Sequence, residues 1–195
     1  MSALAPEDRL RADLYNYLGV LLAAPPDQML LDQTAQLSGD DTALGRAIDD
    51  LAKAARGTKP RDVAREYNAL FVGLGRGELL PYASYYLTGF LNEKPLARLR
   101  GDMARLRIAR TPNTFEPEDN AASLLEMMGG MIVGRFGEAV PLAAQKDFFA
   151  KHLGPWMGHF FDDLSKAKTA KLYTHVGAVG AAFMDIEREA FRLAA

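Results

Sequence analysis

Residues 79–91 read Leu79-Leu80-Pro81-Tyr82-Ala83-Ser84-Tyr85-Tyr86-Leu87-Thr88-Gly89-Phe90-Leu91, a stretch dense in aromatic and apolar side chains. It follows a glycine-rich break at 73–77, and no residue in it suits acid–base or metal chemistry. Such a segment forms either core or a surface that holds another chain. Its three tyrosines are spaced too widely around a helix to face one core together. We therefore expect at least one of them at a surface or groove.

Apolar side chains recur at helical spacing along the chain, and no alternating strand pattern interrupts them. One stripe predicts a helix that Pro6 opens and Pro25-Pro26 ends, because proline lacks the amide donor a helix needs. That stripe consists of Leu10, Leu14, Tyr17, Leu18 and Leu21.

Further stripes predict helices that open near Pro60, after Pro81, near Pro95 and near Lys168. The last of them contains Gly177 and Gly180, which lower helix propensity by about 1 kcal/mol each. We expect the close approach of a neighbouring helix to offset this loss. The predicted fold is all-α, a single globular bundle of roughly nine to eleven short helices.

The clearest linker covers 110–117, which contains two prolines and little periodicity. Pro117 followed by Glu118 and Asp119 predicts a helix start, because proline fits the first helical position and acids favour the positive end of the helix dipole. The predicted organisation is an N-terminal helical part at 1–110, a hinge at 111–120 and a C-terminal helical part at 121–195.

Composition narrows the class of protein. The chain has 195 residues, 49% of them hydrophobic, a formal net charge of −2 and no cysteine. This net charge gives no sign of the basic surface that nucleic-acid binding needs. The lack of cysteine excludes thiol nucleophiles and cysteine-bound metals. No apolar run approaches the roughly 20 residues that span a bilayer, and the first residues do not resemble a signal peptide. We expect a cytoplasmic protein without a membrane span.

No motif predicts catalysis, a metal or a cofactor. Gly73-Leu74-Gly75-Arg76-Gly77 lacks phosphate-loop spacing and is typical of a helix stop and turn. The three histidines have no spacing that places two of them on one helical face. Met127, Met128 and Met131 fit core packing, and an adaptable peptide groove is the alternative.

Several motifs resemble the TorD/DmsD family of cytoplasmic chaperones that mature molybdenum-containing oxidoreductases. They occur in the expected order over about 67–191: Tyr67-x-x-Leu70-Phe71-x-Gly73, Pro81-x-x-Ser84-x-Tyr86, Gly89, Glu93-x-Pro95-Leu96, Glu116-Pro117-x-Asp119, and later Pro155-Trp156 and Phe160-Phe161. The family's Glu-Pro-x-Asp element ends in histidine, whereas this chain has Asn120, which cannot carry a positive charge.

The resemblance implies a TorD-like fold and a chaperone that is not an enzyme. It implies that the chain binds the twin-arginine signal peptide, the body of a molybdoenzyme precursor, or both, and assists cofactor insertion before export. Aromatic walls with acids at one end would suit a basic and apolar signal peptide. The residues that we expect to bind it are Tyr67, Phe71, Pro81, Tyr82, Ser84, Tyr86, Glu116, Asp119 and Asn120.

The segment around residues 86–96 is most similar to chaperones of formate dehydrogenase. An enzyme of the dimethyl sulfoxide or trimethylamine N-oxide reductase type is also possible as the client, that is, the molybdoenzyme that the chaperone matures. A non-catalytic helical scaffold or oligomerisation protein is the alternative, with the aromatic stretch as a homomeric interface. A helical enzyme is a weaker alternative because titratable groups do not converge in the sequence. Some relatives form homodimers by exchanging helices, and a long linker permits this here.

Overall fold

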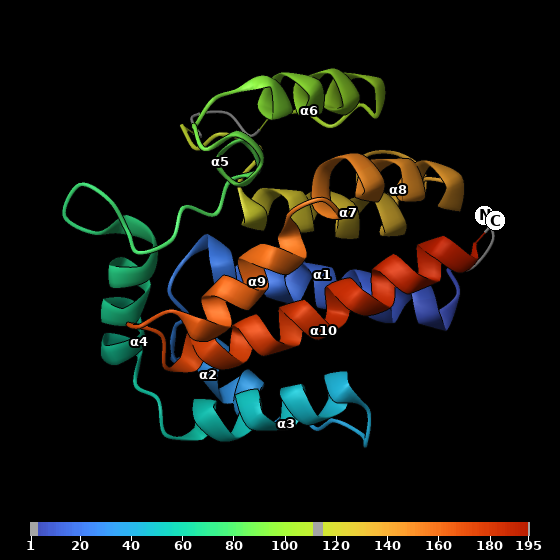
Figure 1. Cartoon of the computed structure of the whole chain (residues 1–195). Coiled ribbons are helices and arrows are strands. Elements are labelled where there is room, and N and C mark those ends of the chain that lie inside the picture. Colours follow the sequence, from blue (N-terminus) through green and yellow to red (C-terminus); the bar gives the residue numbers. More distant parts are fainter. Residues whose placement is uncertain (1–3, 111–114, 195) are drawn as a thin grey trace. The chain divides into compact units, whose positions relative to one another are not determined.

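The computed structural model describes residues 4–110 and 115–194, and the elements of these residues are all helical (Figure 1). The α-helices are α1 (Pro6–Ala23), α2 (Gln28–Ala35), α3 (Ala43–Arg56), α4 (Pro60–Tyr67), α5 (Ala83–Thr88), α6 (Lys94–Arg105), α7 (Ala121–Val133), α8 (Leu142–Phe148), α9 (Met157–Lys166) and α10 (Leu172–Leu193). Two π-helical turns, η1 (Asn68–Val72) and η2 (Phe149–Leu153), continue α4 and α8. The predicted all-α class is therefore confirmed.

The chain forms two compact units. Unit 1 consists of Met1–Ala23 with Pro81–Trp156, and unit 2 consists of Ala24–Leu80 with Met157–Ala195. The hinge predicted at 111–120 falls within the sequence of unit 1. Because its residues 111–114 lie outside the described part of the chain, the hinge stays a prediction.

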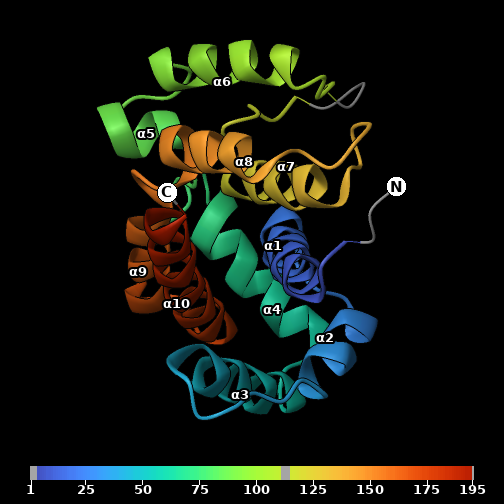
Figure 2. The same ribbon diagram turned by 90° about the vertical axis from the view of Figure 1, so that its right-hand side faces the viewer.

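In unit 1, α1 packs along α7, and α8 and η2 also contact α7 (Figure 2). The two long helices approach closely where Gly19 faces the Ala122 carbonyl and where Gly129 faces the Asn16 side chain. The methionines Met127, Met128 and Met131 are buried, which supports their assignment to the core.

The buried face of α1 differs from the predicted stripe. Leu10 is 70% exposed, whereas Tyr15, outside the stripe, is fully buried with Leu18 and Leu21. Gly19 and Asn16 are among the residues of α1 that lie against α7, so the face that contacts α7 is turned away from the predicted stripe.

In unit 2, α10 packs against α9 and α3, and α2 packs against α3. Gly177 and Gly180 lie where α9 comes closest: an added Cβ would meet the backbone of Ser165 at one position and the ring of Phe161 at the other. The predicted close approach at these glycines is confirmed.

Several helix boundaries differ from the sequence-based predictions. The helix predicted to open at Pro117 begins at Ala121, with Asn120 as its N-cap, and the last helix begins at Leu172 rather than near Lys168. The carboxylates before Ala121 and the backbone amides before Leu172 form hydrogen bonds with other segments of the chain. Helix α2 was not predicted; its start is capped by the Asp27 carboxylate, which accepts from the Leu30 N–H at 2.8 Å.

The stop predicted at Gly73 is confirmed, whereas the helix predicted after Pro81, which was expected to carry Gly89 and Phe90, ends before them at Thr88. Gly73 ends η1 with φ of 62°, and Gly89 ends α5 with φ of 81°, both in a region that glycine adopts without strain. Among the described residues, no helix combines the length and the hydropathy needed to cross a bilayer.

Candidate functional site

Two segments of unit 1 that are far apart in sequence pair at the start of α7. Tyr82 and Asn120 form an isolated antiparallel bridge, in which the Ala83 N–H donates to the Asp119 carbonyl at 2.9 Å and the Ala121 N–H donates to the Pro81 carbonyl at 2.8 Å. This pairing brings the aromatic stretch against the acidic segment, so five predicted binding residues lie together: Pro81, Tyr82, Ser84, Asp119 and Asn120.

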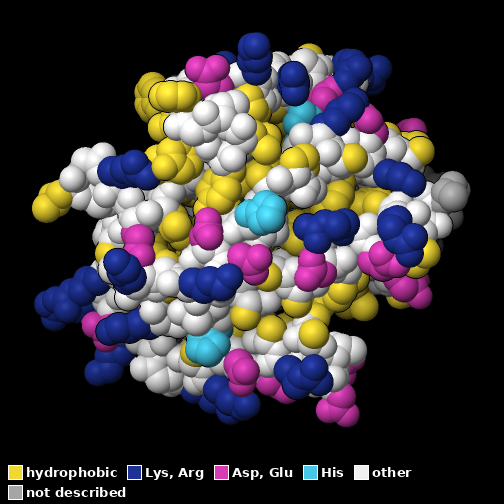
Figure 3. All heavy atoms as spheres, in the orientation of Figure 1, with side chains coloured by type: hydrophobic (Ala, Val, Ile, Leu, Met, Phe, Trp, Pro, Cys, Tyr) yellow, Lys and Arg dark blue, Asp and Glu magenta, His cyan; other side chains and the backbone are white. Residues whose placement is uncertain are grey.

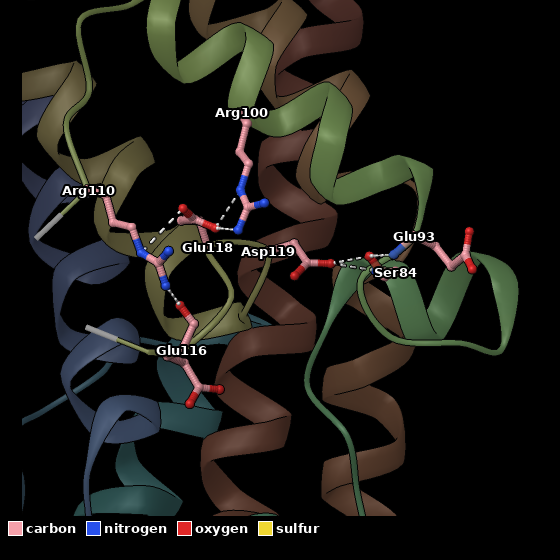
Figure 4. Close-up of polar contacts among 7 residues, drawn as sticks. All are labelled: Ser84, Glu93, Arg100, Arg110, Glu116, Glu118 and Asp119. Atoms are coloured by element: carbon pink, nitrogen blue, oxygen red, sulfur yellow. Dashed lines mark hydrogen bonds and ion pairs between the residues drawn. The ribbon is translucent and has the colours of Figure 1, made fainter. Parts of the chain in front are cut away.

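Asp119 is the most deeply buried acid of this cluster, with 1% of its surface exposed. Its Oδ2 accepts from the backbone N–H of Ser84 at 2.8 Å and from the Ser84 hydroxyl at 2.5 Å (Figure 4). The Ser84 Oγ in turn accepts from the Glu93 N–H at 3.3 Å. Asp119 Oδ1 is buried and has no hydrogen-bond donor among the described residues.

Glu118 points away from Asp119, toward two arginines (Figure 4). Its Oε2 accepts from Arg100 Nε and Nη2 at 3.0 and 2.9 Å, and its Oε1 lies 3.5 Å from Arg110 Nε. Burial raises the pKa of the Glu118 carboxyl, but the hydrogen bonds from Arg100 and the charge of Arg110 outweigh it and hold the pKa below 4.5. Glu118 therefore ties α6 and the following linker to the start of α7.

These contacts explain why the helix does not start at Pro117. Glu118 and Asp119 place their carboxylates on Arg100 and Ser84, so neither is available to the amides at the helix start. The side chain of Asn120 accepts from the Ala122 N–H at 2.9 Å and caps α7 instead.

Glu116 lies at the exposed edge of the cluster. Its carboxylate accepts a hydrogen bond from the Tyr82 hydroxyl and one at 3.4 Å from the Asn120 amide. Burial, followed by the hydrogen bond to Glu116, raises the pKa of Tyr82 above its ordinary value of 10. The tyrosine therefore stays protonated and keeps donating.

A small pocket of about 100 Å³ opens beside the acids. Its polar lining includes three glutamates and one arginine, and its apolar lining comes mainly from α6, α7 and Phe136. The residues are Met103, Ile108, Ala109, Arg110, Glu116, Glu118, Ser123, Glu126, Met127 and Phe136. The sequence analysis did not predict Glu126 and Phe136 as pocket residues, because no local sequence pattern indicates a pocket formed by segments that are separate in sequence.

The remaining predicted residues lie apart from this cluster. Tyr86 contacts Trp156 within unit 1, with ring centroids 5.3 Å apart. Tyr67 and Phe71 belong to unit 2, where their rings lie 6.0 and 5.4 Å from that of Tyr173. Each of the three tyrosines of the aromatic stretch is partly exposed, as expected.

The hydroxyl and the carboxylates of the cluster are engaged mainly with one another and with backbone groups. The Ser84 hydroxyl donates to a carboxylate, and no histidine contacts it in the described residues. No group of three or more potential ligands for a metal ion occurs in the described part of the chain either. The cluster thus consists of acids that fix loops, a carboxylate oxygen without a donor among the described residues, and a small pocket with a partly apolar lining.

Comparison with known proteins gives the family. The model of the nitrate reductase delta subunit family matches residues 37–162, which is more than half of the chain. The chaperone protein TorD of Vibrio cholerae serotype O1 is 27% identical over 166 residues, which cover 78% of this chain and 76% of that protein. TorD of Aliivibrio fischeri is 29% identical over 150 residues, which cover 68% and 69% of the two chains.

A crystal structure shows a similar fold. It belongs to a putative redox enzyme maturation protein from Archaeoglobus fulgidus, with a TM-score of 0.57 and 18% identity over 90% of this chain and 93% of the other. The chain belongs to the nitrate reductase delta subunit family, which includes the TorD chaperones. The resemblance stated from the motifs is thus confirmed, and the protein is a maturation chaperone of that family.

Proposed function

We propose that this chaperone binds the twin-arginine signal peptide of a molybdoenzyme precursor in the cytoplasm and assists cofactor insertion before export. Glu116, Asp119 and Asn120 form the polar end of the binding surface. In unit 1, Pro81, Tyr82, Ser84 and Tyr86 support its apolar wall. A contact of the client with Tyr67 and Phe71, which belong to unit 2, is a separate prediction.

The observation that carries the proposal is the unpaired Oδ1 of Asp119. A buried acceptor without a donor costs about 1–3 kcal/mol, so such a group persists where a partner satisfies it. A guanidinium group carries five N–H donors and forms strong, charge-assisted hydrogen bonds with carboxylate oxygens. An arginine of the signal peptide that reaches Oδ1 would supply the missing donor while Oδ2 stays bound to Ser84, and the exposed Glu116 adds charge of the right sign.

The test is calorimetric titration with signal peptides of formate dehydrogenases and of dimethyl sulfoxide and trimethylamine N-oxide reductases. Each peptide is paired with a variant in which both arginines are lysines. We expect micromolar binding of one class and weaker binding of its lysine variant, because the ammonium group of lysine is more strongly hydrated than a guanidinium group and is harder to bring to a buried acceptor. The class that binds identifies the client.

The site is tested with the double substitution Glu116→Gln and Asp119→Asn, which should weaken binding by about tenfold or more while helicity is retained. The matched control is Asp185→Asn with Glu189→Gln on α10, which changes the net charge equally at exposed ion pairs. Equal weakening in both proteins would exclude the assigned acids. If no peptide binds, the alternative of a non-catalytic helical scaffold or oligomerisation protein would be favoured.

A further inference from the structure

A second pocket in unit 1 lies away from the acidic cluster, between α6 and the turn that follows α8. Its volume is about 970 Å³, and it is open along one side. Its lining combines four cationic residues with small and apolar ones: Leu87, Thr88, Lys94, Pro95, Ala97, Arg98, Gly101, Asp102, Arg105, Ala150, Lys151, His152 and Pro155.

The charge of this groove is opposite to that of the signal-peptide surface. Lys94 and Arg98 have no carboxylate partner among the described residues, while Arg105 pairs with Asp102, and Lys151 with Asp147 at 2.6 Å. His152 lies 2.7 Å from the Asp102 carboxylate, and burial lowers the pKa of its imidazole. Figure 3 shows dark-blue Lys and Arg side chains gathered over α6, on a molecule whose net charge is −2.

The cations are distributed along the helix rather than gathered at one point. Lys94, Arg98 and Arg105 follow i, i+4 and i+11 spacing on one face of α6, which spans about 16 Å at the rise of an α-helix. A single phosphate or carboxylate would need donors that converge within a few ångströms, as in a typical small-molecule site. A row of this length favours a polypeptide that carries several acidic side chains.

Gly101 lies in the middle of the same face and is not required by packing. A Cβ added at this position would meet no atom within 4 Å, in contrast to the packed glycines of α10. Glycine inside a helix lowers stability by about 1 kcal/mol relative to alanine, so its presence calls for another reason. With Ala97 one turn before it, Gly101 leaves the floor of the groove low enough for the backbone of a partner to approach.

Exposed apolar residues extend this surface beyond the end of α5. Leu87 lines the groove with 42% of its surface exposed, and Phe90 and Leu91 are 69% and 42% exposed. An amphipathic helix bound in a groove needs both an apolar contact and matching charges at the rim. The groove provides an apolar contact at Leu87 and positive charges at Lys94 and Arg98.

We propose that this groove holds an acidic amphipathic helix of the client's mature part, as a second contact separate from the signal peptide. The identity of the partner rests on the proposed function. The chemistry of the contact rests on the groove itself, whose positive charge disfavours a twin-arginine segment.

The experiment uses a fluorescent peptide of about 16 residues with a leucine stripe flanked by glutamates, and its glutamine counterpart. Fluorescence anisotropy should show binding of the acidic peptide and at least about tenfold weaker binding of the neutral one. The variant Lys94→Glu with Arg98→Glu should reduce binding by about tenfold or more, whereas Arg61→Glu with Arg65→Glu on α4, at the same spacing, should not. Equal losses in the two variants would overturn the proposal.

Gly101→Gln provides a test without a change of charge. Because its side chain enters open space, the variant should fold normally by circular dichroism and still lose the acidic peptide. Retained binding would overturn the proposal, as would a groove that binds tripolyphosphate but not the acidic peptide. The Lys94/Arg98 variant should keep its affinity for the twin-arginine peptide, so failure of one site is distinguishable from failure of the other.

Discussion

At the scale of single residues, neighbours in sequence have separate roles. Glu118 and Asp119 are adjacent, yet one binds two arginines and the other binds Ser84. Of the two, only Asp119 keeps a buried oxygen that has no donor within residues 4–110 and 115–194, which supports its assignment to the partner in preference to Glu118. From the sequence, helix capping was the first expectation for both acids and binding of a basic peptide was the alternative. The structure corrects the first expectation, because Asn120 caps α7.

Replacing Glu118 by Gln should make stability less dependent on acid pH. The folded pKa of Glu118 lies below 4.5, so its stabilising effect is complete above this value and is lost as pH falls through the folded pKa. We expect Glu118→Gln to lower the free energy of unfolding by about 1–3 kcal/mol near neutral pH. The difference from the wild type should shrink at about pH 3.5, measured by urea denaturation. A deficit of equal size at both pH values would contradict this assignment.

At the scale of helices, the start of α10 depends on two glutamates from distant segments. Glu78 accepts from the N–H groups of Lys168 and Thr169, and Glu66 accepts from those of Lys171, Leu172 and Tyr173. These acids hold the segment before Leu172 outside the helix and cap the helix that follows. This explains why the predicted start near Lys168 was wrong.

The glycines of two helices should respond in opposite ways to alanine. Gly180→Ala would force a Cβ into the ring of Phe161, and we expect a loss of about 1–3 kcal/mol in the free energy of unfolding. Gly101→Ala, with open space around its Cβ, should raise the stability by up to about 1 kcal/mol through helix propensity. Thermal and urea denaturation of both variants checks this pair, and a stabilised Gly180→Ala protein would refute the close packing of α9 and α10.

At the scale of the whole molecule, the order of the units along the chain bears on assembly. Helix α1 belongs to unit 1, although the residues that follow it, Ala24–Leu80, belong to unit 2. Each unit is therefore built from segments that are separate in sequence. Such an arrangement is compatible with exchange of helices between two copies.

The homodimer by helix exchange accordingly stays a testable prediction. Sedimentation velocity should detect a mass that rises with protein concentration, and deletion of residues within 111–114 should abolish the larger species. A single monomeric mass over the whole concentration range would argue against exchange. So would a dimer that persists after the deletion, because the linker would then not be needed.

The sequence by itself determined the helical class, the family and two of the helix ends. The stops at Pro25-Pro26 and Gly73 follow from local backbone rules, since a missing amide or a positive φ acts without help from distant residues. The aromatic and acidic motifs were also readable, and they do pair through Tyr82 and Asn120.

Only the tertiary structure decided which groups meet. The orientation of α1, the arginine partners of Glu118, the unpaired oxygen of Asp119 and the cationic groove of α6 all depend on distances between segments remote in sequence. Charge pairing and close packing act over a few ångströms, and no local pattern fixes such distances. For this reason the sequence predicts the fold and the family. The buried acceptor of Asp119 and the cationic groove of α6, which we propose bind the client, can be located only in the tertiary structure.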